Sequence, residues 1–423
     1  MLQLNTIKND PERVIQLLKI KNFEAEALVA DIIELDRRRR ETQKIMDDGL
    51  AEANKLAKEI GFLFKNGRGD EATALKERSA ELKKETQALG NTLDETRKEL
   101  DEKLVLLPNL PHPGVPAGNS EEDNELVESR DIEIALEQTA LPHWELAEKY
   151  DIIDFELGSK VTGAGFPFYK GKGARLQRAL INFFLEEGIK AGYAEIQPPL
   201  FVNEDSAYGT GQLPDKDGQM YHIGEDNFYT IPTAEVPVTN IYRDVILDLA
   251  DLPVKNVAYS SCFRREAGSY GKDVRGLNRL HQFDKVEIVQ ISHPDNSYSV
   301  LEEMRSYVAS LLEKLELPYR ILKLCGGDIS FTSALTYDFE VYSAAQKRWL
   351  EVSSVSNFEA FQSNRMKLRF RDENGKTRLA HTLNGSALAL PRIVAALLEN
   401  KQTDDGIVIP EAIRPFTGFD LIN

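Results

Sequence analysis

The chain has little cysteine and no long apolar run, and both shortages exclude whole classes of protein. Only Cys262 and Cys325 are present among 423 residues, far apart and outside any CxxC motif. This spacing excludes a disulfide framework and a cysteine-rich zinc site, and it suits a reducing cytosol. No stretch of about 18 consecutive apolar residues is present, so we expect neither a membrane anchor nor a signal peptide. We therefore expect a cytoplasmic protein without zinc.

Basic residues are also outnumbered. Lysine and arginine total 52 against 69 acidic residues, which gives a formal net charge of −17. Such a surface repels nucleic acid unless positive potential is gathered locally. Residues 31–105 hold 16 basic and 18 acidic side chains and include the densest basic cluster, Arg37–Arg40. This segment is therefore the least acidic large part of the chain.

Residues 28–104 differ in composition from the rest, because charged residues, alanine, leucine, glutamine and threonine dominate there. Steps of four and three residues lead from Leu28 to Ile60, and after a break at Gly61–Gly69 the spacing resumes at Leu75. This heptad pattern predicts two helices folded back as an antiparallel coiled coil, with the glycine segment at its tip. Each helix of about 30–35 residues would be about 45–52 Å long. A hairpin of that length has far more surface than core, so it projects from another domain.

The composition changes again at residues 106–125, which are rich in proline, glycine and asparagine. Proline fixes φ and removes a backbone donor, so we expect a linker there. Beyond it, expected helices at Gly173–Ala191 and Ser299–Leu317 alternate with β-rich runs that often follow one another directly. This order predicts an α+β fold, with a mostly antiparallel sheet and flanking helices. The expected parts are an N-terminal domain at 1–105 with its arm at about 28–104, the linker at 106–125, and a second domain at 126–423.

Common nucleotide-binding signatures are missing. There is no GxxxxGK[ST] loop, and the glycines that follow Gly209 lack the third glycine of a dinucleotide fingerprint. The sequence HIGE at His222–Glu225 resembles a synthetase signature of another class only in part, and no KMSKS follows it. None of these segments therefore predicts a nucleotide site.

The window Cys262–Gln290 gathers basic residues although the chain is acidic, and it reads as a strand, a loop and a returning strand. Because side chains alternate along a strand, Arg264 shares a face with Glu266, and Phe283 shares one with Glu287. Arginine can hold a phosphate with two parallel donors, and an aromatic ring can stack on a base. Buried carboxylates can hold an ammonium group. The hairpin favours a site for a nucleotide and an amine, with an exposed salt-bridged hairpin as the alternative.

This window resembles motif 2 of the class II aminoacyl-tRNA synthetases, in the form carried by bacterial-type seryl-tRNA synthetases. Other segments resemble the same family in the expected order: motif 1 at Gly192–Val202, a serine-binding TxE loop at Thr233–Glu235, a strand of metal and nucleotide ligands at Glu351–Phe358, and motif 3 at Thr382–Arg392. The arm and the linker fit as well. The resemblance implies a homodimer that activates L-serine with ATP and Mg²⁺ and charges tRNA(Ser), with tRNA(Sec) as a second candidate. The arm would bind the tRNA, and residues 126–423 would be the catalytic domain.

The resemblance also implies roles for individual residues. The catalytic residues would be Arg264, Glu351 and Arg392. L-serine would be bound by Thr233, Ala234, Glu235, Glu287, Asn384 and Ser386. ATP would be bound by Arg264, Arg265, Glu266, Arg279, Leu280, Phe283, Glu351, Val352, Ser353, Ser354 and Arg392. Mg²⁺ would be held by Glu351 and Ser354.

Two positions depart from the family pattern. Arg265 stands where a small residue is common, and its side chain can point to the opposite face of the strand. Pro391 directly precedes the motif 3 arginine, where glycine is usual. Proline biases Leu390 away from the helical region, so we expect the helix start to shift by a residue or two.

Three alternatives stay open on these residues. The first is a class II synthetase for threonine, proline or glycine, against which the TxE loop, Glu287, the missing zinc ligands and the arm weigh. The second is an amino acid:carrier-protein ligase, which shares the catalytic domain but lacks a long arm. The third is a coiled-coil interaction protein with a degenerate enzyme domain. Intact Arg264, Glu287, Glu351 and Arg392 weigh against degeneracy.

Overall fold

The computed structural model describes residues 1–132, 140–216, 218–266 and 275–423. They form two compact units. The helical unit comprises Leu2–Lys19 and Phe23–Pro108, and the sheet unit comprises Met1, Ile20–Asn22 and Asn109–Asn423. Within the described ranges, no helix combines the length and apolarity that crossing a bilayer requires. The predicted boundaries at residues 105 and 125 stay predictions.

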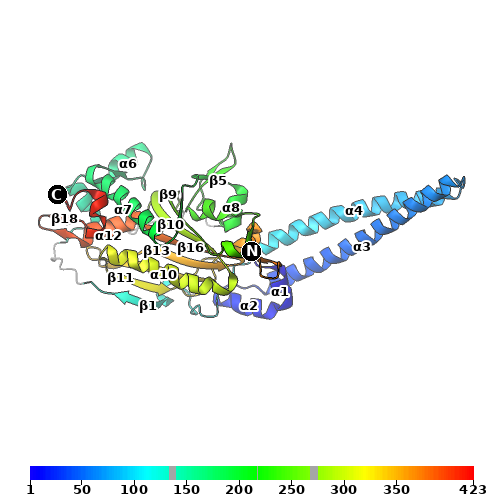
Figure 1. Ribbon diagram of the computed structural model, residues 1–423, viewed down its shortest axis with the longest axis horizontal. Helices are drawn as coiled ribbons and strands as arrows, with labels where there is room; N and C mark the ends of the chain where they lie inside the picture. The colour runs from blue at the N-terminus through cyan, green and yellow to red at the C-terminus, as the bar shows by residue number, and fades with distance from the viewer. Residues whose placement is uncertain (133–139, 217, 267–274) are drawn as a thin grey trace. The chain divides into compact units, whose positions relative to one another are not determined.

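The helical unit contains two short helices, α1 (Leu4–Asn9) and α2 (Pro11–Ile20), and two long ones, α3 (Glu26–Lys65) and α4 (Ala72–Leu104) (Figure 1). The long helices are antiparallel, because Asp31 pairs with Lys103 at 2.7 Å whereas Glu52 pairs with Arg78 at 3.3 Å. With 40 and 33 residues, they are about 60 and 50 Å long. The predicted coiled-coil arm is therefore confirmed, although α3 is longer than the prediction.

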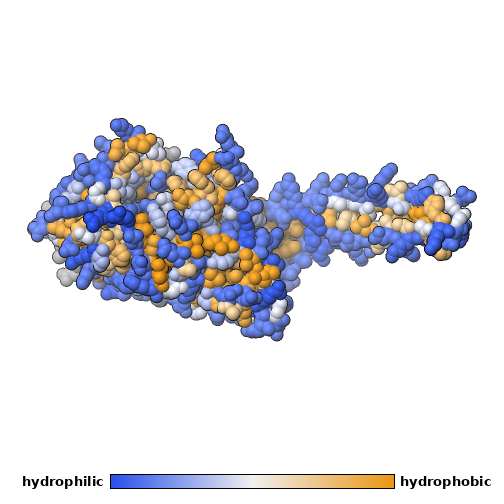
Figure 2. All heavy atoms as spheres, turned by 45° about the horizontal axis from the view of Figure 1, so that its top comes forward, coloured by the Kyte–Doolittle hydropathy of each residue, from blue (hydrophilic) through white to orange (hydrophobic). Residues whose placement is uncertain are grey.

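A narrow seam of buried side chains joins α3 to α4, and Figure 2 shows apolar side chains along the hairpin between polar flanks. Its apolar members include Val29, Ile32, Leu35, Leu63, Leu82, Leu93, Leu100 and Leu104. The side chains in the middle of the seam are small or polar. A Cβ atom on Gly49 would lie 3.0 Å from the Cγ2 of Thr86. The helices approach closely at this point because Gly49 has no side chain.

The turn between the long helices is shorter than the predicted break. α3 continues past Gly61, and residues 66–71 alone form the turn. Gly67 has a φ of 71°, and the N–H of Arg68 bonds to the carbonyl of Leu63 at 2.9 Å. This is the hydrogen bond of a Schellman motif, which ends a helix at a glycine in the left-handed conformation. A glycine such as Gly61 costs helix stability without ending the helix, and the prediction did not separate the two cases.

The sheet unit is built on an eight-stranded sheet, and the predicted α+β fold is confirmed. Its strand order is β1-β11-β12-β13-β16-β10-β9-β4, with every described neighbour antiparallel except the parallel pair of β4 and β9. The strands are β1 (Glu125–Arg130), β4 (Ala194–Ile196), β9 (Val254–Phe263), β10 (Gln282–Ser292), β11 (Tyr319–Lys323), β12 (Leu335–Ser343), β13 (Arg348–Glu359) and β16 (His381–Ala389).

The two faces of the central strands carry different side chains. Along β10, Val286 and Ile288 belong to the hydrophobic core, whereas Lys285 and Glu287 line a pocket. The neighbouring strands add to the pocket face Ser354, Ser356, Asn384 and Ser386. Because successive side chains of a strand point to opposite faces, one face of the sheet packs on helices and the other carries polar groups.

Three helices pack on the apolar face: α7 (Gly171–Lys190), α10 (Ser297–Lys314) and α12 (Leu390–Asn400) (Figure 1). The first two lie where the sequence predicts helices. α12 follows β16 directly, with Pro391 in its first turn. A proline is tolerated there because the first N–H groups of a helix have no intrahelical partner. The bias of Leu390 away from the helical region therefore does not delay the start of α12.

Smaller elements complete the sheet unit. The short strands are β2 (Ile153–Asp154), β3 (Phe168–Tyr169), β5 (Phe201–Asn203), β6 (His222–Ile223), β7 (Phe228–Thr230), β8 (Ile246–Asp248), β14 (Arg369–Arg371), β15 (Thr377–Leu379), β17 (Gln402–Thr403), β18 (Gly406–Val408) and β19 (Leu421–Ile422). The short helices are α5 (His143–Lys149), α6 (Phe155–Val161), α8 (Glu204–Thr210), α9 (Glu235–Asn240), α11 (Phe361–Met366) and α13 (Arg414–Thr417).

Candidate active site

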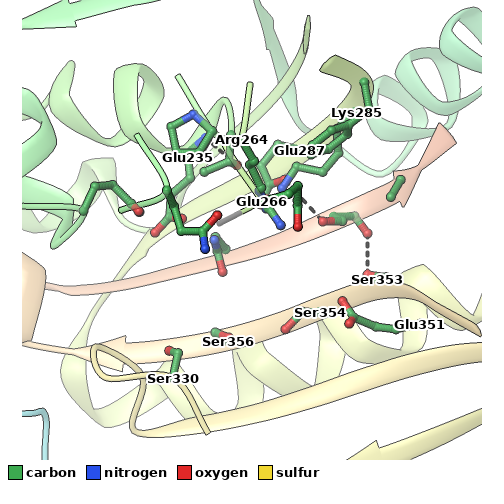
Figure 3. A pocket seen from close by; sticks show the side chains of 18 of the residues that line it. Glu235, Arg264, Glu266, Lys285, Glu287, Ser330, Glu351, Ser353, Ser354 and Ser356 are labelled. Carbon is green, nitrogen blue, oxygen red and sulfur yellow. Dashed lines mark hydrogen bonds and ion pairs between the residues drawn. The ribbon is translucent and has the colours of Figure 1, made fainter. Parts of the chain in front are cut away.

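A cavity of about 830 Å³ opens on the polar face of the central sheet (Figure 3). Strands β10, β13 and β16 supply its floor, and its walls include residues 211, 212, 214–216, 277–280 and 330–332. The volume falls in the range of about 300–1,000 Å³ that is typical of small-molecule sites. The cavity is large enough for a nucleotide together with a small amino acid.

Most of the predicted site residues meet in this cavity: Thr233, Glu235, Arg264, Glu266, Arg279, Leu280, Phe283, Glu287, Glu351, Val352, Ser353, Ser354, Asn384, Ser386 and Arg392. Two predicted residues, Ala234 and Arg265, are not among the described residues that line it. Ala234 is fully buried, and the Cζ of Arg265 lies 5.6 Å from the ring centre of Tyr221. A binding role for Ala234 would have to come from its backbone.

The chain leaves the sheet just after β9. The strand ends before Arg264, whereas the sequence predicts a strand that continues to Glu266. The N–H of Arg265 bonds to the carbonyl of Gln219 at 2.9 Å, so this residue is outside the ladder, and Glu266 has a φ of 49°. The predicted loop continues through 267–274, which lie outside the described residues. Arg264 and Glu266 nevertheless reach the same cavity.

One end of the cavity is cationic and aromatic. The Cζ of Arg264 lies 5.2 Å from the ring centre of Phe283. The Nη1 of Arg279 pairs with the Oε2 of Glu266 at 2.8 Å. Guanidinium groups present parallel N–H donors that match phosphate oxygens, and an aromatic face can stack on a base. This end is suited to a nucleotide triphosphate.

Arg392 borders the same end from the start of α12. Its Nη1 donates to the carbonyl oxygen of Glu351 at 2.6 Å and lies 3.6 Å from the Oε2 of that residue. Its Nε donates to the carbonyl oxygen of Asn278 at 3.0 Å. Two hydrogen bonds to backbone carbonyls fix the plane of the guanidinium group.

The other end of the cavity carries Glu235, the first residue of α9, which is 5% exposed. Its Oε1 accepts a hydrogen bond from the Nε2 of Gln362 at 2.7 Å, and its N–H donates to the Oγ1 of Thr233 at 3.2 Å. Burial raises the pKa of Glu235 to about 7, against the opposing effect of the hydrogen bond from Gln362. A carboxyl group in this state becomes charged when a cation binds beside it.

Glu287 lies near this end and is 1% exposed. Its Oε2 forms an ion pair with the ammonium group of Lys285 and accepts a hydrogen bond from the Oγ of Ser386 at 3.4 Å. A buried carboxylate is tolerated when a cation and hydrogen bonds compensate its charge. The pair of Glu287 and Ser386 can therefore recognise a small hydroxyl group.

Sequence reasoning missed the roles of Lys285 and Gln362 in this site. Strand alternation in the sequence already places Lys285 on the face of Phe283 and Glu287, but no role was predicted for it. Nothing local pointed to Gln362. It reaches Glu235 because α11 packs there, and its Oε1 accepts a hydrogen bond from Thr382 at 2.7 Å.

The predicted metal ligands Glu351 and Ser354 lie on β13, and Asp338 of β12 stands opposite Ser354 in the ladder. The Oδ1 of Asp338 is buried and has no hydrogen-bond partner among the described residues. Burial, and then the charge of Glu351, raise the pKa of Asp338 well above its usual value. No group of three or more His, Cys, Asp or Glu in the described part of the chain is arranged to hold a metal ion. A cation here would need hydroxyl, water or phosphate oxygens as well.

The chain matches two protein families. Residues 1–111 match the seryl-tRNA synthetase N-terminal domain, and residues 221–401 match the tRNA synthetase class II core domain (G, H, P, S and T). A serine–tRNA ligase from Salinibacter ruber is 53% identical over 421 residues, which are 99% of this chain and 98% of that protein. A serine–tRNA ligase from Chlorobium phaeobacteroides is 45% identical over 428 residues, covering 100% of both chains.

Solved structures agree with these relatives. Seryl-tRNA synthetase from Pyrococcus horikoshii, complexed with ATP, has a TM-score of 0.92 and 35% identity, and the match covers 100% of this chain and 99% of that one. Prolyl-tRNA synthetase from Giardia lamblia has a TM-score of 0.56 at 15% identity over 64% of this chain and 54% of that one, a likeness of fold alone. The resemblance predicted from the sequence is confirmed over the whole length. The chain belongs to the seryl-tRNA synthetase family of class II aminoacyl-tRNA synthetases.

Proposed function

We propose that this cavity joins L-serine to ATP as seryl-adenylate and that the chain then transfers serine to tRNA(Ser). The observation that carries the proposal is the contrast between the two ends of one cavity. Guanidinium groups and a phenyl ring stand at one end, and buried, hydrogen-bonded carboxylates stand at the other. A serine carboxylate oxygen would attack the α-phosphorus between them, and the bond to pyrophosphate would break. Such chemistry depends on positioning and charge compensation.

At the nucleotide end, Arg264 would hold the α-phosphate beside the serine carboxylate and compensate the charge that builds up there. Phe283 and Arg392 would enclose the nucleotide. Arg279 would reach the γ-phosphate. Because Arg279 pairs with Glu266 at 2.8 Å, phosphate binding would replace one anionic partner by another. That exchange would free Glu266 for adenosine, which the backbone of Leu280 also contacts in this proposal.

At the serine end, the ion pair of Lys285 with Glu287 supports the division of roles that the family resemblance implies, with the ammonium group at Thr233 and Glu235 and the hydroxyl at Glu287 and Ser386. Because Lys285 already compensates Glu287, the ammonium group of serine would go to Glu235, with Thr233 beside it. Glu287 and Ser386 would then bond to the serine hydroxyl. A site built to bond a hydroxyl rejects alanine strongly, because its buried polar groups would lose their partner.

The residues that fit Mg²⁺ lie on β13, beside the nucleotide end of the cavity. Glu351 and Ser354 offer oxygen ligands, and the buried Asp338 Oδ1 without a hydrogen-bond partner among the described residues lies next to them. Hard cations such as Mg²⁺ prefer oxygen donors and are often held by one or two carboxylates together with substrate phosphates. When bound, Mg²⁺ would compensate phosphate charge. The contribution of the chain would be to hold Glu351 and Ser354 on the rigid strand β13.

The helical unit would bind tRNA(Ser), with tRNA(Sec) as a second candidate. Its nearly neutral arm contrasts with the acidic remainder of the chain. Double-stranded RNA is recognised mainly by shape and phosphate contacts, so the arm needs no sequence motif for this role. Long, straight helices such as α3 and α4 are suited to lie along an RNA stem.

We also propose a homodimer in the cytoplasm. Figure 2 shows apolar side chains gathered on the visible face of the sheet unit. Apolar residues that are more than a third exposed include Ile189, Leu200, Phe201 and Phe228, which lie in or near the segment resembling motif 1. A two-fold axis buries the same patch on both copies. The two cysteines are buried and free, which suits a reducing compartment.

Serine-dependent exchange of pyrophosphate into ATP tests the proposed function. We expect exchange with L-serine and little with alanine, glycine, threonine or proline. Aminoacylation of tRNA(Ser) should follow with the same enzyme. Exchange with another amino acid alone, or transfer to a carrier protein in place of tRNA, would contradict the proposal.

A further inference from the structure

A buried histidine outside the cavity is connected to one of its walls. His143 begins α5 and is 0% exposed. Its Nδ1 lies 2.7 Å from the Oε1 of Glu399, and its Nε2 accepts the N–H of Leu277 at 2.8 Å. Because Nε2 accepts, the ring proton is on Nδ1 and the imidazole is neutral. His143 therefore joins Glu399 to residues 277–280, which line the nucleotide end of the cavity.

Glu399 is the fixed point of this connection. It lies near the end of α12 and is 0% exposed. Its Oε1 also accepts the backbone N–H of His143 at 3.0 Å and the Nε2 of Gln346 at 3.0 Å, and Ser343 donates to its Oε2. Burial alone would raise the pKa of Glu399, but hydrogen bonds from His143 and Ser343 hold this pKa below its usual value. Hydrogen bonds from several donors hold this buried carboxylate in one position.

A second connection joins α12 to the same wall. The Nδ2 of Asn278 donates to the Oε1 of Gln346 at 3.0 Å, and the carbonyl of Asn278 accepts from the Nε of Arg392 at 3.0 Å. Arg392 and Glu399 lie about two turns apart on one side of α12. Helix α12 thus holds Leu277 through Glu399 and His143, and Asn278 through Arg392 and Gln346.

The close approach of α5 to this wall is visible in two further contacts. Gly276 has a φ of 67°, and a Cβ atom there would lie 2.2 Å from the Nε2 of His143. The Cζ of Arg275 lies 4.6 Å from the ring centre of Trp144. A glycine is required at 276 for both its backbone conformation and the space it leaves. The segment that leads to Leu277 is therefore built onto α5.

We propose that His143 is a positioning residue for ATP, which acts with Glu399 as a buried clamp on Leu277 and Asn278. Neither His143 nor Glu399 is among the described residues that line the cavity. They act by fixing the backbone from which Arg279 and Leu280 extend. This inference rests on the proposed assignment of that end of the cavity to ATP.

We expect loss of the clamp to weaken ATP binding selectively. Without His143, the N–H of Leu277 loses its only hydrogen bond to a side chain among the described residues. A buried donor left unpaired is costly, so the backbone would shift to find another partner. Glu235 and Glu287 stand on α9 and β10, and neither bonds to this wall in the described structure. Serine binding should therefore change little.

Two isosteric substitutions separate the halves of the clamp. The amide of His143→Gln reaches the position of Nε2 and can still accept from Leu277. The amide of His143→Asn reaches only the position of Nδ1 and can still bond Glu399. We expect His143→Asn to raise the KM for ATP in pyrophosphate exchange about tenfold, with the KM for serine unchanged. His143→Gln should recover most of the ATP affinity.

Controls separate positioning from general destabilisation. His381 bonds to Ser297 at 2.8 Å and is not among the described residues of the cavity, so His381→Asn should lower thermal stability with both KM values unchanged. If His143→Asn does not fold, Gln346→Ala tests the second connection and should raise the KM for ATP about threefold. Wild-type exchange that requires serine establishes the proposed function in the same experiment. With that activity present, an unchanged KM for ATP, or equal changes in both KM values, would overturn the clamp.

Discussion

The helical unit and the sheet unit of this chain are built by different kinds of contact. In the helical unit, α3 and α4 meet along one seam whose members repeat every three or four residues. In the sheet unit, β10 pairs with β16, so that Glu287 faces Ser386 from a distant part of the sequence. A repeated seam survives shortening, whereas a site assembled from distant strands depends on single residues. We therefore expect amino acid activation and tRNA recognition to separate between the two units.

The largest effect should come from Arg264. Removing one preorganised charge partner of a transition state costs about a hundredfold to a thousandfold in rate. We expect Arg264→Ala to lower pyrophosphate exchange by about a thousandfold, and aminoacylation with it. Arg264→Lys should also be poor, because one ammonium group cannot replace a guanidinium fork. A folded Arg264→Ala variant with a near-normal exchange rate would refute the role.

Shortening the arm tests the role of the helical unit. Gln43 bonds to Arg97 at 2.9 Å and Gly49 faces Thr86. Deletion of residues 42–93 therefore joins positions of α3 and α4 that face each other. With a short Gly-Ser turn in place, we expect pyrophosphate exchange to stay near wild type. Aminoacylation of tRNA(Ser) should fall by about a hundredfold, because each lost phosphate contact weakens RNA binding.

The two half-reactions together decide what the arm does. Equal loss of exchange and aminoacylation would mean that the arm supports the catalytic fold. Unchanged aminoacylation would mean that the arm has another partner. The salt dependence of tRNA binding should also become shallower by about one unit of slope for each contact removed.

Glu287 tests whether the serine end and the nucleotide end of the cavity act separately. Glu287→Ala removes the hydroxyl acceptor and leaves Lys285 without its buried ion-pair partner, so we expect the KM for serine to rise about thirtyfold. The KM for ATP should change much less. Glu287→Gln keeps the shape and is the control for packing. If the KM for ATP rises and that for serine does not, Glu287 belongs to the nucleotide end.

The smallest effect concerns pH. The pKa of Glu235 is raised to about 7 by burial, so its carboxyl group is increasingly protonated below that pH. Only the ionised form attracts the ammonium group of serine. The KM for serine should therefore rise as the pH falls below about 7, by up to about tenfold per unit, with the KM for ATP steadier. Glu235→Gln should bind serine weakly and without this pH dependence. A wild-type KM that is flat between pH 6 and 8 would contradict the assignment.

Several features were predictable because they depend only on the local sequence. The heptad spacing from Leu28 predicts the arm, and the strand alternation around Arg264 and Glu287 predicts a polar face. The turn at the tip was not predictable in extent, because only the hydrogen bond from Arg68 to Leu63 shows that Gly67 ends α3. Glycine composition alone cannot distinguish a helix interior from a helix end.

The residues of the site also fall into those that the sequence predicted and those that it did not. Ordered motifs placed most of the predicted residues in one cavity, because strand and loop positions carry their side chains with them. Gln362 and Asp338 had no such signal. Gln362 acts on Glu235 only because α11 packs on α8, which in turn packs on α9. Asp338 matters only through its cross-strand partner Ser354.

Periodicity and residue chemistry are local properties, so the α+β class, the helical arm and the types of side chain at each end of the cavity could be predicted from the amino-acid sequence. Which charges are already paired, and which are open to a substrate, depends on how the chain folds. The tertiary structure placed Lys285 on Glu287, and it joined His143 to Glu399 and Leu277. The physical reason is that burial and strand pairing set the strength of a charge or a hydrogen bond, and both arise only when distant segments pack together.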